Sequence, residues 1–238
     1  MVVEKNTKNV VANKLPFYID IHAHHLPATP SNDVLTVLNR LPLDPMPITS
    51  NSNVYYSVGW HPWWVNEQSP IDWDNFAFQL QQSNTILVGE CGLDHLRGAP
   101  LTIQIPIFEQ QIRLAQKYQK PIIVHCVRAW SELISLRRST QNTIPMIIHG
   151  FVAKPTVLQM LLSANCHVSF GTALLRSNPV LHHSFRTMPA NKLFLETDDS
   201  QIPIQEIYQA AAAIRKISVE ELSNILHKNW NSLFCNSI

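Results

Sequence analysis

The sequence is poor in the residues that several kinds of binding loop and interface require. Only 6 of its 238 residues are glycine, which argues against a glycine-rich loop that cradles phosphate, and neither a GxGxxG nor a P-loop pattern occurs. Charged residues make up 15% of the chain, and 18 Lys and Arg balance 17 Asp and Glu. This balance gives no whole-chain electrostatic signal for nucleic acid or anionic lipid. Any such partner must be recognised by a local site.

Paired cysteines and long apolar runs are also missing. The four cysteines form no CxxC pair, and a chain of this length does not need disulfide staples, so we expect a reducing compartment. The first 15 residues mix Glu, Lys and Asn with a few valines and lack the continuous apolar core of a signal peptide. No run approaches the roughly 18 apolar residues of a membrane span. We therefore expect a cytoplasmic protein without membrane association, and nothing in the sequence indicates an obligate protein partner.

Short aliphatic or β-branched runs alternate with longer amphipathic stretches, as in βα units around a parallel sheet. A single domain over residues 1–238 is expected, because this length is close to the roughly 250 residues of a typical α/β barrel. Seven strands are predicted, at 17–22, 54–58, 85–90, 121–125, 146–149, 166–170 and 193–196. Six helices are predicted, at 104–119, 129–138, 155–163, 179–187, 204–216 and 218 to about 236.

The segment 26–53 does not follow this alternation, because five prolines divide it into short pieces. We expect a loop-rich excursion here with one short helix around 33–40. The predicted fold class is therefore α/β, a TIM-type (β/α) barrel whose second βα unit is either missing or shortened, with a very short strand near 47–49.

Polar side chains gather at the ends of the predicted strands. In chain order they are His22, His24, His61, Glu90, His125, His149 and Asp198. Because the carboxyl ends of parallel barrel strands open on one face, these residues should converge on one site. His22 and His24 are two residues apart and should point to the same side, as should Asp20. The remaining histidines have no such context and are predicted to be surface or packing residues: His25, His95, His167, His182, His183 and His227.

Imidazole and carboxylate groups are common ligands of divalent metals. A single histidine at a strand end is more often a hydrogen-bonded structural residue than a metal ligand. The inference of metal binding therefore rests on the occurrence of all these residues together. Four histidines with Glu90 and Asp198 are too many ligands for one tetrahedral zinc, but they suit two ions that share a bridging carboxylate, either Glu90 or Asp198. We expect two divalent metal ions as cofactors, with zinc, manganese and magnesium all open.

Two further expectations concern the neighbours of these residues. Cys91 and Cys126 each directly follow a presumed ligand, so they should face away from the site as packing residues rather than nucleophiles. The three tryptophans at positions 60, 63 and 64 flank His61. They are equally consistent with a stacking wall for bases and with a hydrophobic lid.

Several short motifs occur in order between residues 20 and 198. They read DIHAH from residue 20, GWHP from 59, GECGLD from 89, QIPIF from 104, PIIVH from 121, HGF from 149 and LETD from 195. A lone HxH pair is weak evidence, but this ordered set is specific. It resembles the TatD-like metal-dependent deoxyribonucleases, which belong with the amidohydrolase-type (β/α)₈ barrels.

The resemblance assigns the ligands to two ions. It implies one ion held by His22, His24, Glu90 and Asp198, and another held by Glu90, His125 and His149. Glu90 would then be the bridge.

The resemblance also implies the remaining roles. Asp198 orients or deprotonates the attacking water, and His61 contacts the phosphate. Asp94 holds a metal ligand in place from behind. The family usually has an arginine two residues after the histidine that corresponds to His125. In this chain the arginine comes one residue later, as Arg128, and it is assigned to substrate binding together with His61. After LETD the family usually continues with a small residue, a proline and an aromatic, whereas this chain continues with Asp, Ser and Gln at 199–201.

The function implied is a hydrolase of ester bonds with a binuclear metal site, cleaving phosphodiester bonds in DNA from an end by attack of an activated water. The alternative is a binuclear hydrolase of a small-molecule amide, ester or lactone without nuclease activity, because a fold does not fix a substrate. Whether Arg128, Lys154 and Arg176 line the barrel mouth distinguishes the two. A metal-binding scaffold that acts through partners fits six ligands at an open face least well.

Overall fold

The computed structural model describes residues 17–26, 31–44, 52–66 and 70–234. The elements in chain order are β1 (Tyr18–Ala23), β2 (Val34–Arg40), β3 (Val54–Val58), α1 (Trp73–Leu80), β4 (Thr85–Asp94), α2 (Leu101–Tyr118), β5 (Ile122–Val127), α3 (Trp130–Ser139), β6 (Met146–Ile148), α4 (Pro155–Ser163), β7 (His167–Phe170), the 3₁₀ turn η1 (Thr172–Leu175), α5 (Pro179–Thr187), the 3₁₀ turn η2 (Ala190–Lys192), β8 (Leu193–Leu195), α6 (Ile204–Arg215) and α7 (Val219–Phe234).

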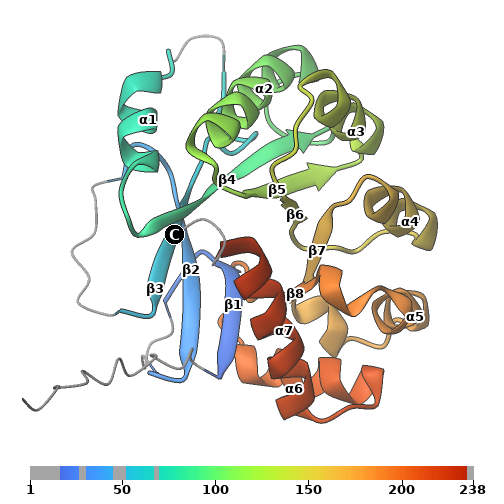
Figure 1. Cartoon of the computed structure of the whole chain (residues 1–238). Coiled ribbons are helices and arrows are strands. Elements are labelled where there is room, and N and C mark those ends of the chain that lie inside the picture. Colours follow the sequence, from blue (N-terminus) through green and yellow to red (C-terminus); the bar gives the residue numbers. More distant parts are fainter. Residues whose placement is uncertain (1–16, 27–30, 45–51, 67–69, 235–238) are drawn as a thin grey trace, which may run out of the picture.

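The strands form one eight-stranded parallel sheet in sequential order, β1 to β8. An isolated bridge between Ala23 at the end of β1 and Asp198, three residues after β8, joins the two edges of the sheet, so the sheet is a nearly closed barrel. Helices α2 to α5 follow one another around the outside (Figure 1). The predicted TIM-type barrel is confirmed, and each of the six predicted helices is present. Helix α1 was not predicted.

The prediction for the second unit was wrong in one respect. Residues 34–40 form β2, a full strand that pairs with β1 and β3, and not a short helix. Leu35 and Val37 fill the barrel interior, while Val34 and Thr36 are buried on the other face. The sequence of a strand that is buried on both faces is a nearly continuous apolar run. A short buried helix can have the same pattern, so the sequence does not distinguish the two. The described residues between β1 and β3 contain no helix, and the predicted strand near 47–49 lies outside the described residues.

Two hydrophobic layers support the barrel. An inner cluster takes one or two side chains from most strands, near the strand beginnings: Ile19, Ile21, Leu35, Val37, Leu87, Ile123, Ile147 and Phe194. Trp230, Leu233 and Phe234 of α7 complete it. A larger outer cluster lies between the sheet and the helices and contains Cys91, Cys126 and Cys166, which confirms that Cys91 and Cys126 are packing residues. The inner cluster fills the amino-terminal end of the barrel and leaves the carboxyl end for polar residues.

None of the helices in the described part of the chain has the length and apolar character needed to cross a bilayer.

His167 at the start of β7 provides a test of the packing. Burial, assisted by the nearby Lys192 and Arg137, lowers the pKa of His167 to about 4. In the unfolded chain a histidine titrates near 6.5, so the unfolded state binds more protons than the native state between these values. The contribution of His167 to stability is therefore present above pH 6.5 and is lost as the pH falls toward 4.

We expect the His167→Phe variant to lose less stability on acidification than the wild type. The difference in the free energy of unfolding between pH 7.5 and 4.5 should be smaller by roughly 2 to 3 kcal/mol. Urea unfolding of both proteins at the two pH values measures it. An identical pH dependence of the free energy of unfolding in the two proteins would contradict the lowered pKa of His167.

Candidate metal centre

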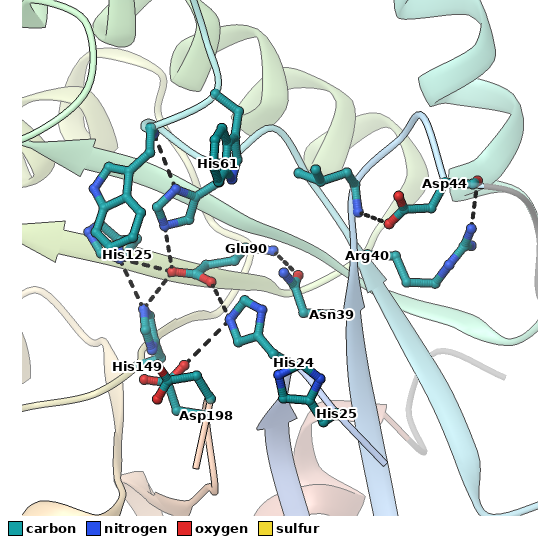
Figure 2. Close-up of a pocket in the computed structure, with 14 residues that line it drawn as sticks. His24, His25, Asn39, Arg40, Asp44, His61, Glu90, His125, His149 and Asp198 are labelled. Atoms are coloured by element: carbon teal, nitrogen blue, oxygen red, sulfur yellow. Dashed lines mark hydrogen bonds and ion pairs between the residues drawn. The ribbon is translucent and has the colours of Figure 1, made fainter. Parts of the chain in front are cut away.

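Side chains from seven chain positions meet at the carboxyl end of the barrel, as predicted from the strand ends, and all but His22 are labelled in Figure 2. The residues that converge are His22 and His24 at the end of β1, His61 after β3, Glu90 in β4, His125 in β5, His149 after β6 and Asp198 after β8. Three overlapping groups among them could each hold a cation.

The carboxylate of Glu90 is the centre of this arrangement and is only 2% exposed. Its Oε2 atom lies 3.1 Å from Nε2 of His24 and 3.3 Å from Nε2 of His22. Its Oε1 atom lies 2.9 Å from Nδ1 of His125 and 2.8 Å from Nε2 of His149. Nε2 of His61 also lies 2.9 Å from Oε1. The two carboxylate oxygens therefore face different imidazoles, two at Oε2 and three at Oε1, which is the disposition expected of a bridging ligand.

Asp198 closes both the barrel and the centre. Its N–H donates to the carbonyl of His22 at 3.0 Å, and its own carbonyl accepts from the N–H of His24 at 2.8 Å. The side chain, 37% exposed, puts Oδ1 at 3.4 Å from Nε2 of His24 and 3.6 Å from Nε2 of His22. Its φ of +58° is a left-handed conformation that aspartate tolerates better than most residues. The backbone bridge therefore fixes the distance between this carboxylate and the two histidines.

The expectation that Asp20 points to the same side as His22 was wrong. The register between β1 and β2 shifts between Asp20 and Ala23, so an extra residue interrupts the alternation. Asp20 instead accepts hydrogen bonds from the N–H and Oγ1 of Thr197 at 3.0 and 2.7 Å. It anchors the segment that carries Asp198, and burial raises the pKa of Asp20 to about 7.

Asp94 contacts His125 from behind. Its Oδ2 lies 3.1 Å from Nε2 of His125 and accepts from Nε1 of Trp63 at 2.7 Å. If Nε2 of His125 carries the proton, its Nδ1, which faces Glu90, keeps the lone pair that a metal ion needs. This is the position expected of a residue that orients a ligand.

Two buried glutamines of α2 clamp the strand ends. Gln104 accepts from the N–H of Asp94 at 2.7 Å and donates to its carbonyl at 2.9 Å. Gln111, seven residues further and so on the same helix face, pairs with the N–H and carbonyl of Trp60 at 2.7 and 3.1 Å. The helix thereby fixes the backbone next to Asp94 and His61. The QIPIF motif contained Gln104, but its role was not evident from the sequence.

Asn39 is a further residue that the sequence did not reveal. Its Oδ1 accepts from the N–H of Glu90 at 2.6 Å and from Oγ of Ser57 at 3.1 Å. Asn39 belongs to β2, the strand that was not predicted. It holds the backbone of Glu90, and its side chain also lines the cavity described below.

Glu196 supports His149 in a similar way. This fully buried carboxylate accepts from Oγ of Ser169 and the N–H of Gly150, and its Oε1 lies 3.7 Å from Nδ1 of His149. Its position two residues before Asp198 in the LETD motif was the signal available in the sequence.

His61 has a hydrogen-bond pattern that differs from the other histidines. The N–H of Trp63 donates to its Nδ1 at 3.2 Å, and burial, partly offset by Glu90, lowers the pKa of His61. A neutral imidazole that accepts at Nδ1 carries its proton on Nε2. That Nε2 lies 2.9 Å from Oε1 of Glu90. In this tautomer Nε2 donates to an oxygen of Glu90, whereas the other tautomer would offer its lone pair to a metal, as in the group of His61, Glu90 and His125.

The charges in the centre depend strongly on one another. Burial opposes ionisation of Glu90, but His149, His125 and His22 outweigh it and hold the pKa of Glu90 well below its ordinary value. Burial also opposes the charge on His22, yet Asp198 and Glu90 raise the pKa of His22 to about 9. Despite burial, His22 lowers the pKa of Asp198 to about 2. Buried negative charge here must be met by protons or by cations.

The residues fit a metal ion. His22 is fully buried, and although its Nε2 lies 3.3 and 3.6 Å from the carboxylates of Glu90 and Asp198, neither ring nitrogen makes a well-directed hydrogen bond. An unsatisfied buried polar atom is costly, and a cation between Nε2 of His22 and the carboxylates of Glu90 and Asp198 would satisfy it. Imidazole with carboxylate is a ligand set that suits zinc or manganese, whereas magnesium prefers oxygen ligands.

A cavity of about 450 Å³ opens above the centre. Of the predicted substrate contacts, His61 lines it. Arg128 is exposed with a φ of +52°. Among the described residues, the arginine that lines the cavity is Arg40 of β2. The three cationic residues proposed for the barrel mouth do not line it: Arg128, Lys154 and Arg176. His25, predicted to be a surface or packing residue, lies on the cavity rim, as does Asp199.

Comparison with known proteins agrees with the fold and with a metal-dependent hydrolase. A model of the TatD related DNase family matches residues 47–235. The uncharacterized metal-dependent hydrolase YcfH of Escherichia coli K12 is 24% identical over 203 residues, covering 79% of this chain and 76% of that protein. The 3'-5' ssDNA/RNA exonuclease TatD of Edwardsiella piscicida is 31% identical over 142 residues, covering 58% of this chain and 53% of that protein.

The solved structure of the Escherichia coli TatD homolog YJJV superposes with a TM-score of 0.76 at 18% sequence identity, covering 93% of this chain and 99% of that chain. Barrel and site together define a metal-dependent hydrolase. The chain belongs to the TatD related DNase family.

Removing the support of Asn39 should weaken metal binding. The Asn39→Leu variant loses the acceptor for the N–H of Glu90, so the bridging carboxylate is less well fixed, and we expect about tenfold or greater loss of zinc affinity. Competition with a chromophoric chelator measures this. The Ser57→Ala variant, which removes only the second bond to the same oxygen, serves as the matched control. Equal affinity of Asn39→Leu and wild type would show that Asn39 does not position Glu90.

Proposed function

We propose that this protein hydrolyses phosphodiester bonds in DNA, shortening a strand from an end, with two divalent ions at the centre. The main observation in support of this proposal is the position of the Glu90 carboxylate, which directs one oxygen to His22 and His24 and the other to His125 and His149. The name of the Edwardsiella relative supports a nucleic-acid substrate. So does that of the human 3'-5' RNA nuclease TATDN2, which is 25% identical over 183 residues, covering 72% of this chain and 24% of that protein.

The proposed ligands fall into two sets. His22, His24, Glu90 and Asp198 would hold one ion, and Glu90, His125 and His149 would hold the other. When bound, such ions lower the pKa of water toward neutrality and stabilise the leaving oxygen of a displacement.

The chain's own groups would contribute orientation and proton handling. Asp198 is partly exposed toward the cavity, and its lowered pKa keeps it ionised, so its carboxylate can orient the attacking water. His61, protonated on Nε2, can donate to a phosphate oxygen. Asp94 keeps His125 in its orientation. Arg128 as a substrate contact remains a prediction.

One observation favours a second function. Among the described residues that line the cavity, the lysine or arginine is Arg40, whose guanidinium donates to the carbonyl of Asp44 at 2.7 Å and turns away from Glu90 (Figure 2). A cavity without a cationic side chain directed at the centre is compatible with a neutral substrate. The second candidate is therefore hydrolysis of a small-molecule amide, ester or lactone on the same centre.

The direct test is hydrolysis of end-labelled single-stranded DNA. Metal-stripped protein is resupplied separately with magnesium, manganese or zinc, and Asp198→Asn is run in parallel. We expect a ladder of stepwise shortened products that depends on the added ion and disappears in the variant, because Asp198 both holds an ion and orients the water.

The outcome that would overturn the nuclease is intact DNA under every condition while two ions per chain are found by elemental analysis. Hydrolysis of a neutral ester or lactone by the same sample would then establish the second candidate.

The Glu90→Gln variant tests the bridge itself. The amide has the same shape but offers one oxygen and no charge, so hydrolysis should fall to background and the metal content should fall below two ions per chain. Elemental analysis of the purified variant measures the second effect independently of activity. Glu109→Gln on α2 is the control for the substitution, because this partly exposed carboxylate pairs with Arg113 and lies outside the centre. Retention of two ions and of hydrolysis by Glu90→Gln would rule out the bridging role.

A further inference from the structure

The walls of the cavity above the metal centre come mainly from one side of the barrel. Apart from the centre itself, its lining comes mainly from two places: the end of β2, with Asn39, Arg40, Leu41 and Asp44, and the turn after β3, with Trp63 and Trp64. A substrate at the centre would therefore extend over β2 and β3, and Arg128 is not among the residues that line this space.

The β2 wall of the cavity is well fixed. Within it the N–H of Leu41 donates to Oδ2 of Asp44 at 2.8 Å, and the N–H of Asp44 donates to the carbonyl of Leu41 at 3.0 Å. From α1, Asn75 and Gln79 both donate to the carbonyl of Pro42. This wall is therefore preorganised before any substrate arrives.

The three tryptophans after β3 have distinct environments. Trp60 is buried in the outer core. Trp63 donates through Nε1 to Asp94 at 2.7 Å, and the guanidinium of Arg97 stacks on its ring at 3.7 Å. Trp64 lines the cavity yet remains 57% exposed, while its N–H is tied to the carbonyl of His61 at 3.0 Å. Of the three, Trp64 is the ring available to a ligand, and the turn that aims His61 at Glu90 also fixes its backbone.

The charge of this region suits an aromatic ring better than a second phosphate. Arg40 is paired with the carbonyl of Asp44 and lies 5.5 Å from the ring centre of Tyr56, and the carboxylate of Asp44 offsets its charge. Leu41 adds apolar surface to the lining. A nearly neutral space that contains an exposed indole matches the flat face of a nucleobase, because base–aromatic stacking does not require charge or a particular sequence.

We propose that Trp64 is the stacking platform for one nucleobase next to the phosphodiester bond at the metal centre. This inference rests on the proposed nuclease function and adds a nucleobase subsite to it. Trp64 would hold the base through its ring face, in a sequence-tolerant manner, and so set the affinity for the nucleotide beside the cleaved bond.

The test compares substrates with and without a base. Hydrolysis by wild type, Trp64→Ala and Trp64→Phe is measured on a single-stranded oligonucleotide and on two versions that are abasic on one or the other side of the cleaved bond. With the base-bearing substrate, Trp64→Ala should lose about tenfold in kcat/KM, mainly through KM, and Trp64→Phe should recover most of it. With one of the abasic substrates the three proteins should be equal. The similarly exposed Phe78→Ala on α1 is the matched control.

The outcomes separate this inference from the proposed function. Cleavage of DNA by wild type with equal losses of Trp64→Ala on all substrates, or with no loss on any, would overturn the stacking role and leave the nuclease intact. If no protein cleaves DNA, the proposed function fails. The affinity of the metal-loaded proteins for the same oligonucleotides, measured by fluorescence anisotropy, then decides about stacking: an equal Kd for wild type and Trp64→Ala overturns it.

Discussion

The structure depends on one buried negative charge. The carboxylate of Glu90 is enclosed by five imidazoles, with closest atoms at 2.8 to 3.3 Å. Taking a carboxylate out of water is expensive unless positive charge compensates it. Here the compensation comes from protonated histidines or from cations, which compete for the same nitrogen atoms. An excess of histidines around one carboxylate is therefore better explained by cation binding than by stability of the fold alone.

Barrel closure and site geometry are the same feature. The backbone of Asp198 hydrogen-bonds to His22 and His24, and these bonds join the first strand to the segment after the last. The side chains of all three residues then lie around one point. Because Asp20 holds Thr197 through two hydrogen bonds, the closure is buttressed from the outer face of β1. A substitution that weakens the contact between β1 and the segment around Asp198 would therefore change the distances between the side chains of the centre and also the closure of the barrel.

The sequence predicted the convergence of the centre well because topology determines it: His22, Glu90, His125 and the other residues of the centre each follow an apolar run, and parallel strands end on one face. It failed where local patterns were ambiguous. Residues 34–40 satisfy helix and strand patterns alike, and only pairing with β1 and β3 decides between them. Missing β2 concealed Asn39 and Arg40. The direction of Asp20 was mispredicted because a register shift leaves no mark in a single sequence.

The arrangement of charge separates chemistry from recognition. Because Arg40 is turned toward Asp44, the negative charge of a phosphodiester at Glu90 would be met by the divalent ions and by the N–H of His61, not by an arginine. Catalysis would then depend on the ligands that the barrel fixes, whereas the choice of substrate would depend on the walls after β2 and β3. Those walls would then differ from the centre in binding through shape and aromatic surface. A displaced arginine after β5 is therefore compatible with an intact hydrolytic centre, since Arg128 lies outside the residues that line this cavity.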